Sequence, residues 1–126
     1  MIRGIEIVSV PVRNQDVALK FYTEKLGFKV LTDQPFTDQQ RWIELLIPGA
    51  NSKLALFTPE GHENRIGTFQ PVTFSCDDVF ATAKLLKSKG VEFAQEPTTA
   101  VWGAMAIFKD VDGNQFVMSS KKGKSA

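Results

Sequence analysis

The same order of predicted secondary-structure elements occurs twice along the chain. Residues 4–58 have the patterns of a strand, a helix and three further strands, and residues 71–120 have the same patterns in the same order. Gly27, a helix stop, lies 13 positions after the predicted helix cap Asn14, and Gly90 lies 13 positions after the predicted cap Asp77. An internal duplication explains this agreement better than chance.

The individual elements are predicted from two different spacings of apolar residues. Period-two alternation predicts strands, and helical spacing between a cap and a glycine predicts helices. Each half also has a tryptophan in its third predicted strand, Trp42 and Trp102. The strands are expected at 4–12, 28–33, 41–47, 53–58, 71–76, 91–96, 101–108 and 115–120, and the helices at 14–26 and between 77 and 90.

A duplicated β-α-β-β-β unit constrains the fold class. One unit alone would leave a sheet face exposed, so two copies must cover each other, within one chain or between two chains. We expect an α+β fold of two βαβββ modules forming a curved, partly closed mixed sheet with helices on the outside. The chain is predicted to be one domain, with module 1 at 1–58, a linker at 59–68, module 2 at 69–120 and a frayed tail at 121–126.

Composition excludes several classes of partner. Fifteen Lys and Arg residues balance fourteen Asp and Glu residues, which leaves a net charge of +1 without a basic patch for nucleic acid or membrane. No apolar run approaches the roughly 20 residues that span a bilayer. The single cysteine cannot form an intrachain disulfide, and the N-terminus lacks a signal-peptide pattern. We expect a soluble, cytoplasmic protein.

Three local motifs resemble those of one superfamily. They are FYTEKLGF at 21–28, KGVEF at 89–93 and FKDVDGN at 108–114. Together with the repeat, they make the chain similar over nearly its whole length to the glyoxalase/bleomycin-resistance/extradiol dioxygenase (vicinal oxygen chelate) superfamily. The resemblance implies paired βαβββ modules around a cleft.

The metal site of that superfamily does not carry over residue by residue. The resemblance implies ligands on the first and last strands of each half, at Ile7, Leu56, Pro71 and Val117. Hydrocarbon side chains cannot donate a lone pair to Zn²⁺, Ni²⁺ or Fe²⁺. The sequence contains one histidine, which excludes an iron site of two histidines and a carboxylate. We therefore expect no metal, no cofactor and no extradiol dioxygenase activity.

An apolar cleft with a few polar groups is the expected ligand site. Aliphatic and aromatic walls hold flat or apolar small molecules, while hydroxyls orient a ligand or hold water. The tryptophans have an equally acceptable reading as core or dimer-interface residues. The candidate cleft residues are Ile7, Leu56 and Val117 as aliphatic walls, Trp42 and Trp102 as aromatic walls, Glu44 as a polar anchor, and Ser9, Thr73 and Ser119 as hydroxyls.

Two residues are candidates for acid–base chemistry. Glu44 lies among apolar neighbours, so burial in the cleft would raise its pKa. Its alternative is a carboxylate on an edge strand paired with Arg41 or a lysine. His62 lies beside Glu60 and Glu63 as a candidate base, and its alternative is a solvated histidine of the linker.

Other polar residues have structural explanations. Cys76 shares strand parity with buried positions and is expected to behave as a small hydrophobe. Asp77 and Asp78 stand at a helix start, which favours capping over paired-carboxylate chemistry. The segment 110–114 lacks the later carboxylate of a calcium loop and is predicted to be a turn.

The leading functional hypothesis is a metal-independent, homodimeric small-molecule binding protein. Its rival is a glyoxalase-like lyase or isomerase that uses Glu44 or His62. A third alternative is an interaction module whose cleft is filled by its own side chains. The sequence identifies neither the ligand nor whether the modules pair within a chain or swap between chains.

Overall fold

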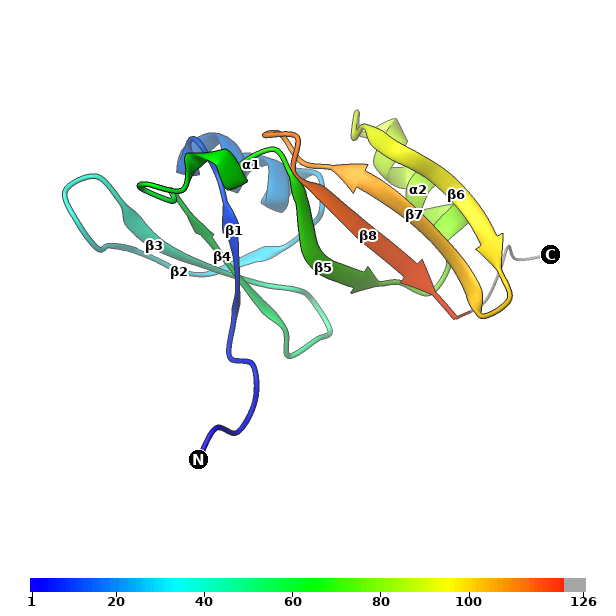
Figure 1. The fold of residues 1–126 in the computed structure, drawn as a ribbon, viewed down its shortest axis with the longest axis horizontal. Helices are drawn as coiled ribbons and strands as arrows, with labels where there is room; N and C mark the ends of the chain where they lie inside the picture. The colour runs from blue at the N-terminus through cyan, green and yellow to red at the C-terminus, as the bar shows by residue number, and fades with distance from the viewer. Residues whose placement is uncertain (122–126) are drawn as a thin grey trace. The chain divides into compact units, whose positions relative to one another are not determined.

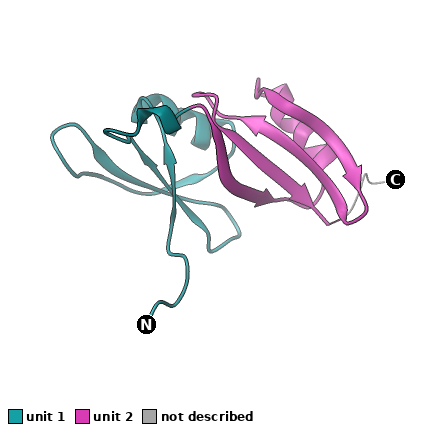
Figure 2. Ribbon diagram, in the orientation of Figure 1, with its two compact units in different colours: residues 1–66 teal, residues 67–126 magenta. Residues whose placement is uncertain are grey.

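The computed structural model describes residues 1–121, and the chain forms two compact units, residues 1–66 and 67–126 (Figure 2). In the described part of each unit, one α-helix packs against a four-stranded mixed sheet. The α+β class and the two βαβββ modules are confirmed. The strands form two separate sheets in place of the single curved sheet that we expected. The predicted tail lies outside the described residues except for residue 121.

The elements follow the predicted order along the chain (Figure 1). A short 3₁₀-helix, η1, occupies part of the predicted linker. The bounds in unit 1 are β1 Val8–Pro11, α1 Gln15–Glu24, β2 Lys29–Pro35, β3 Arg41–Leu46, β4 Lys53–Phe57 and η1 Glu63–Arg65. Those in unit 2 are β5 Phe69–Ser75, α2 Val79–Ser88, β6 Phe93–Ala100, β7 Gly103–Lys109 and β8 Gln115–Ser120.

The sheet of unit 1 has the strand order β1-β4-β3-β2. β1 pairs with β4 in parallel, and the other two pairs are antiparallel. Because side chains alternate between faces, Val10, Leu56 and Ile43 form one cross-strand row on the face covered by α1. These three side chains are at most 1% exposed and belong to the core of this unit.

Helix α1 is held by its cap and by a buried glutamine. The Asn14 side chain accepts a hydrogen bond from Val17 N at 3.0 Å, as predicted. The Gln15 side chain donates to the carbonyls of Arg41 and Leu56 and accepts from Arg41 N. It therefore joins the start of β3 to the end of β4.

Unit 2 repeats this arrangement with the order β5-β8-β7-β6. Its parallel pair is β5 with β8, and the remaining pairs are antiparallel. On the helix-covered face the rings of Phe74, Phe108 and Phe116 lie with centroids 5.4 to 5.9 Å apart. These aromatic contacts form much of the core of unit 2.

Helix α2 begins one residue later than the sequence indicated. Asp78, not Asp77, is the N-cap, and its carboxylate accepts hydrogen bonds from Phe80 N and Ala81 N. The cap-to-stop distance is therefore 12 positions in unit 2 and 13 in unit 1. Asp77 and Asp78 have the same capping chemistry. The backbone conformation decides which of their carboxylates accepts hydrogen bonds from the first N–H groups of the helix.

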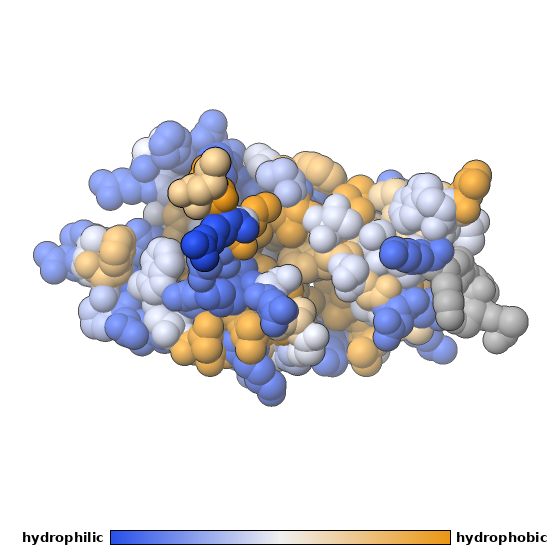
Figure 3. Space-filling model, turned by 90° about the horizontal axis from the view of Figure 1, so that it is seen from below, coloured by the Kyte–Doolittle hydropathy of each residue, from blue (hydrophilic) through white to orange (hydrophobic). Residues whose placement is uncertain are grey.

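The described surface carries scattered apolar side chains. Hydrophobic and hydrophilic regions are interspersed on the face seen in Figure 3. The large exposed hydrophobic residues include Phe36 and Phe69, which are 65% and 56% exposed. Among the described residues, no helix is long and apolar enough to cross a membrane.

Candidate functional site

The side of the unit 1 sheet opposite α1 carries the clearest polar and aromatic cluster; we call it the unit 1 open face. Strand pairing places Ser9, Ala55, Glu44 and Thr32 in one cross-strand row on this face. Trp42 lies two residues before Glu44 on β3 and therefore shares the face. The site is thus built on regular strands, which hold side chains more precisely than loops do.

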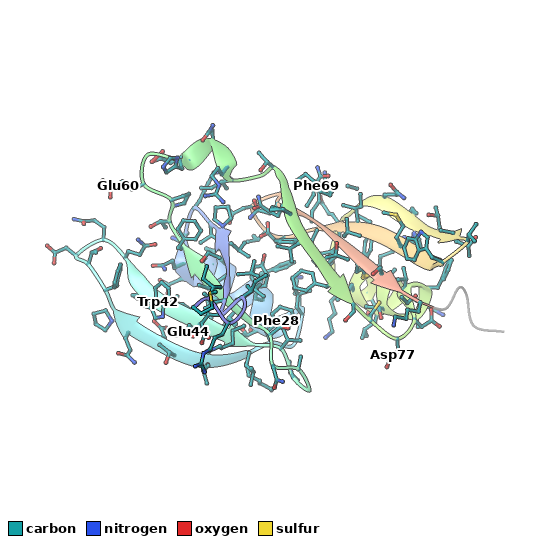
Figure 4. The ribbon with its side chains drawn as sticks, turned by 60° about the horizontal axis from the view of Figure 1, so that its bottom comes forward. Phe28, Trp42, Glu44, Glu60, Phe69 and Asp77 are labelled. Atoms are coloured by element: carbon teal, nitrogen blue, oxygen red, sulfur yellow. The ribbon has the colours of Figure 1, made fainter. Side chains whose placement is uncertain are left out.

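Trp42 and Glu44 are joined by a direct hydrogen bond. The indole Nε1 of Trp42 donates to Oε2 of Glu44 at 2.8 Å, and the two side chains lie next to each other in Figure 4. Phe36 lies beside Trp42, with ring centroids 5.8 Å apart. The bond sets the orientation of the indole ring, and both Trp42 and Glu44 remain partly exposed.

Lys53 adds a positive charge to the same face. Its Nζ lies 3.9 Å from Oε1 of Glu44 and 2.8 Å from Oε1 of Glu6. The hydrogen bond with Glu6 and its negative charge raise the pKa of Lys53, and the ammonium lowers the pKa of Glu6. The unit 1 open face therefore offers an aromatic ring, a carboxylate and an ammonium group within one cluster.

The sequence left open that Glu44 is a carboxylate on an edge strand paired with Arg41 or a lysine, and the structure differs from this description in two respects. β3 lies between β4 and β2, so Glu44 is on an interior strand and not on an edge strand. Arg41 instead donates hydrogen bonds to Asp33 at 2.9 Å and to Asp16 at 2.7 Å. Arg41 points to the helix side because it stands three residues from Glu44 and has the opposite strand parity. The predicted lysine neighbour is present as Lys53.

The structure differs from the sequence-based expectation at Leu56. Its side chain is 1% exposed and belongs to the helix-side core, in the row with Val10 and Ile43. Ala55 takes its place on the open face, opposite Ser9. Spacing counted from distant glycines was one residue off, and in a strand one residue reverses the face. Ile7 precedes β1 and is partly exposed.

Unit 2 has a corresponding open face. Thr73 pairs with Val117 and Ser75 pairs with Ser119, all on the side away from α2. Thr73 is exposed, and Val117 and Ser119 are partly exposed. Trp102 is not in a strand: it lies in the turn between β6 and β7 and is 55% exposed. The prediction that each tryptophan lies in a third strand is therefore correct for Trp42 and wrong for Trp102.

The residues that the resemblance assigns to the superfamily's metal positions have side chains that do not fit a divalent ion. Ile7, Pro71 and Val117 have no donor atoms in their side chains, and neither Leu56 nor Ala55 supplies one. Within residues 1–121, no group of three or more His, Cys, Asp and Glu side chains is arranged to hold a metal. Correcting the register at Leu56 thus leaves the chemistry of the donor set unchanged.

The other candidates lie apart from the Trp42–Glu44 pair. His62 is exposed next to η1, and Glu63 beside it binds the Gly61 amide through its carboxylate. Cys76 is partly buried just after β5, and desolvation raises the pKa of its thiol. Asp110 organises the predicted turn by accepting hydrogen bonds from the amides of Asp112 and Asn114.

Sequence reasoning anticipated a lysine beside Glu44 but did not say which one, and the structure identifies it as Lys53. Its strand was predicted, and it stands two residues before Ala55. Alternation along β4 would have placed it on the open face had the register been correct. The ion pair with Glu6 has no sequence signal, because 47 positions separate the two residues.

Comparison with known proteins gives consistent relatives. The family model described as Glyoxalase/Bleomycin resistance protein/Dioxygenase superfamily matches residues 4–118. The chain is 36% identical over 118 residues to the protein YetH of Bacillus subtilis (strain 168), covering 94% of this chain and 98% of YetH.

Two solved structures share both the fold and about a third of the sequence. The first is a member of the glyoxalase/bleomycin resistance protein/dioxygenase superfamily from Sphaerobacter thermophilus DSM 20745, with 30% identity, a TM-score of 0.85, and coverage of 94% of this chain and 98% of that chain. The second is TnmS3, an antibiotic binding protein from Streptomyces sp. CB03234, with 31% identity, a TM-score of 0.79, and coverage of 96% and 98%.

Proposed function

This chain belongs to the Glyoxalase/Bleomycin resistance protein/Dioxygenase superfamily, and we propose that it is a metal-independent small-molecule binding protein. Its proposed ligand is an apolar or aromatic molecule held on the unit 1 open face. Trp42 and Glu44 are the principal proposed contacts, with Ile7 and Ser9 as the adjoining surface. Thr73 and Val117 are proposed as ligand contacts on the open face of unit 2 itself.

The hydrogen bond from Trp42 to Glu44 is the observation that carries the proposal. An indole that is already oriented loses little rotamer freedom when a flat molecule stacks on it. Aromatic stacking of this kind contributes about 0.5 to 1.5 kcal/mol beyond the burial of area. The fixed ring is therefore suited to serve as a binding platform.

The charges beside the ring favour ligands with polar groups at one edge. Oε2 of Glu44 is engaged by Trp42, while Oε1 has Lys53 at 3.9 Å, beyond hydrogen-bond length. A ligand hydroxyl or amino group can donate to this oxygen, and a ligand acceptor can face the Lys53 ammonium. The neighbour TnmS3 binds an antibiotic, which supports small-molecule binding as the general class of function.

The hydrocarbon residues at the superfamily's metal positions support the metal-independent part of the proposal. The measurement is elemental analysis of protein purified without an affinity tag. We expect substoichiometric Ni, Zn and Fe after dialysis. Stoichiometric metal that survives dialysis would contradict this part of the proposal.

Binding on the unit 1 open face can be tested by nuclear magnetic resonance. The chain has two tryptophans, so the ¹⁵N-labelled protein gives two indole cross-peaks, which Trp42→Phe and Trp102→Phe assign. We expect anilinonaphthalene sulfonate to shift the Trp42 peak in a saturable way. Glu44→Ala should weaken this binding about tenfold, because a hydrogen bond to a charged group contributes about 1.5 kcal/mol.

The control variant for this experiment is Glu24→Ala, which removes an exposed carboxylate from the end of α1. It should leave the titration unchanged. If the Trp42 peak does not move, or if Glu44→Ala and Glu24→Ala behave alike, the proposed site is wrong. The enzymatic alternative replaces the binding proposal if the wild-type chain turns over an oxoaldehyde substrate and Glu44→Ala abolishes this turnover.

Dimerisation and a cytoplasmic location also belong to this proposal. An uncovered sheet face needs a partner surface, and a second copy of the chain supplies one. Light scattering at micromolar concentration should give twice the mass of the 14.0 kDa chain. A monomeric mass across the concentration range would contradict the dimer.

A further inference from the structure

Each unit contains a cavity at the place where its parallel strand pair ends. The unit 1 cavity has a volume of about 610 Å³ and the unit 2 cavity about 550 Å³. The unit 1 cavity is lined by residues that include Val12, Arg13, Gln39, Thr58, Glu60 and Glu63. The unit 2 cavity is lined by residues that include Ser75, Cys76, Asp77, Trp102, Ser119 and Lys121.

The two cavities occupy equivalent positions in the duplicated fold. Val12 N donates to the carbonyl of Phe57 at 2.8 Å, and Cys76 N donates to the carbonyl of Ser119 at 2.9 Å. Val12 and Cys76 each stand two residues before the N-cap of the following helix. The hollow is therefore a product of the βαβββ topology, and its lining was free to diverge between the halves.

The lining of the unit 1 cavity is strongly charged. Arg13, Glu60 and Glu63 contribute ionic groups, and Glu60 is seen in Figure 4 on the loop that follows β4. The Glu63 carboxylate already accepts a hydrogen bond from the Gly61 amide at 2.9 Å. Because this bond already engages the Glu63 carboxylate within the chain, we assign no ligand class to the unit 1 cavity.

The unit 2 cavity has a different lining. Trp102 supplies an indole ring that is 55% exposed. It lies in the β6–β7 turn, and Gln39 lies in the corresponding β2–β3 loop of unit 1. Ser75 and Ser119 supply hydroxyls from paired positions at the strand ends. Asp77, labelled in Figure 4 just beyond β5, supplies an exposed acceptor. An aromatic wall beside such groups matches the general anatomy of small-molecule pockets.

We infer that the unit 2 cavity is a separate binding site for a planar aromatic molecule that carries a hydroxyl group on its edge. The ring of such a molecule stacks on Trp102, and its hydroxyl donates to Asp77 or exchanges hydrogen bonds with Ser75 and Ser119. This site does not involve Trp42 or Glu44, so it can be present whether or not the unit 1 open face binds a ligand.

Naphthol and naphthalene form a matched pair of probes for this site, because they differ by one hydroxyl. In the ¹⁵N-labelled full chain, we expect naphthol to shift the Trp102 indole peak in a saturable way. The affinity for naphthalene should be about tenfold lower, the value of one ligand hydrogen bond. Equal affinities for the two probes would overturn the hydroxyl part of the inference.

Cys76 provides a second readout of the same cavity, since it is the only cysteine in the chain. Bound naphthol should slow alkylation of Cys76 by N-ethylmaleimide. Trp102→Ala should remove most of this protection and weaken binding about tenfold. Val101→Ala is the matched control, because Val101 is fully exposed in the same turn and lies outside the cavity lining.

The outcomes separate this inference from the proposed function. If both probes, anilinonaphthalene sulfonate and naphthol, shift the Trp42 peak alone, the proposed function stays intact and the unit 2 site is overturned. If both probes give a saturable shift of the Trp102 peak alone, the unit 2 site is supported and the proposal for unit 1 is contradicted. Unchanged Cys76 protection in a folded Trp102→Ala variant would overturn the stacking role, as would a shift that rises linearly without saturation.

Discussion

Replacing Gln15 by alanine should destabilise unit 1 more than any other single polar-to-alanine change in α1. Gln15 is 7% exposed and makes three hydrogen bonds with its side chain. Their lengths are 2.7 Å to the Arg41 carbonyl, 2.9 Å to the Leu56 carbonyl and 3.0 Å from the Arg41 amide. Alanine removes all three and leaves backbone groups of two strands without these partners.

The magnitude follows from the net worth of such bonds. Each contributes about 1 kcal/mol, and buried backbone groups left unpaired cost more. Alanine's better helix propensity offsets at most about 0.5 kcal/mol. The expected loss of unfolding free energy is therefore about 2 to 3 kcal/mol, which corresponds to a fall in melting temperature of roughly 10 °C.

Urea denaturation followed by circular dichroism measures this loss, and amide hydrogen exchange at Arg41 locates it. Gln34→Ala is the control, because Gln34 is an exposed glutamine on β2 of the same unit. Its effect should stay within about 0.5 kcal/mol. If Gln15→Ala and Gln34→Ala shift the urea midpoint equally, the glutamine bridge does not stabilise the sheet and our reasoning is wrong.

Three further predictions concern unit 2. Gly103→Ala should cost about 3 kcal/mol or more of unfolding free energy in urea melts, because a Cβ there would lie 2.1 Å from the Ser120 carbonyl oxygen. A urea midpoint equal to that of the wild type would show that the strands separate easily at this point. Asp78→Ala should cost about 1 kcal/mol and Asp77→Ala less than about 0.5 kcal/mol, and the reverse order would return the cap to Asp77. Burial raises the pKa of the Cys76 thiol, so its maleimide alkylation should reach half its maximal rate at higher pH in the folded chain than in the urea-unfolded chain; a lower midpoint in the folded chain would contradict the role of burial.

The sequence was most informative where a residue's role depends on its immediate neighbours. The strand predicted at 115–120 coincides with β8, and the positive φ angles of Gly27 and Gly90 match their role as helix stops. The predicted helix 14–26 was too long at both ends, since α1 is Gln15–Glu24. Helix ends depend on which backbone groups find partners, and apolar spacing does not record this.

Residues of the candidate site were harder to place. Trp42 and Glu44 were recognised from their position in an apolar strand, but their mutual hydrogen bond depends on rotamers that strand parity leaves open. Trp102 was assigned to a strand because its apolar neighbours continue the pattern of β7. The turn that contains it is set by the pairing of Ala100 with Gly103, which is a long-range property of the sheet.

The sequence by itself determined the duplicated βαβββ order and the superfamily, because each of these depends on residue identity and local spacing. Only the tertiary structure decided the strand register, which moved Leu56 into the core and brought Ala55 to the open face. It also decided the encounter of Lys53 with Glu6 and the cavities at the ends of the parallel strand pairs. Register and long-range contacts arise when distant segments pack together, and no local pattern of side chains encodes them.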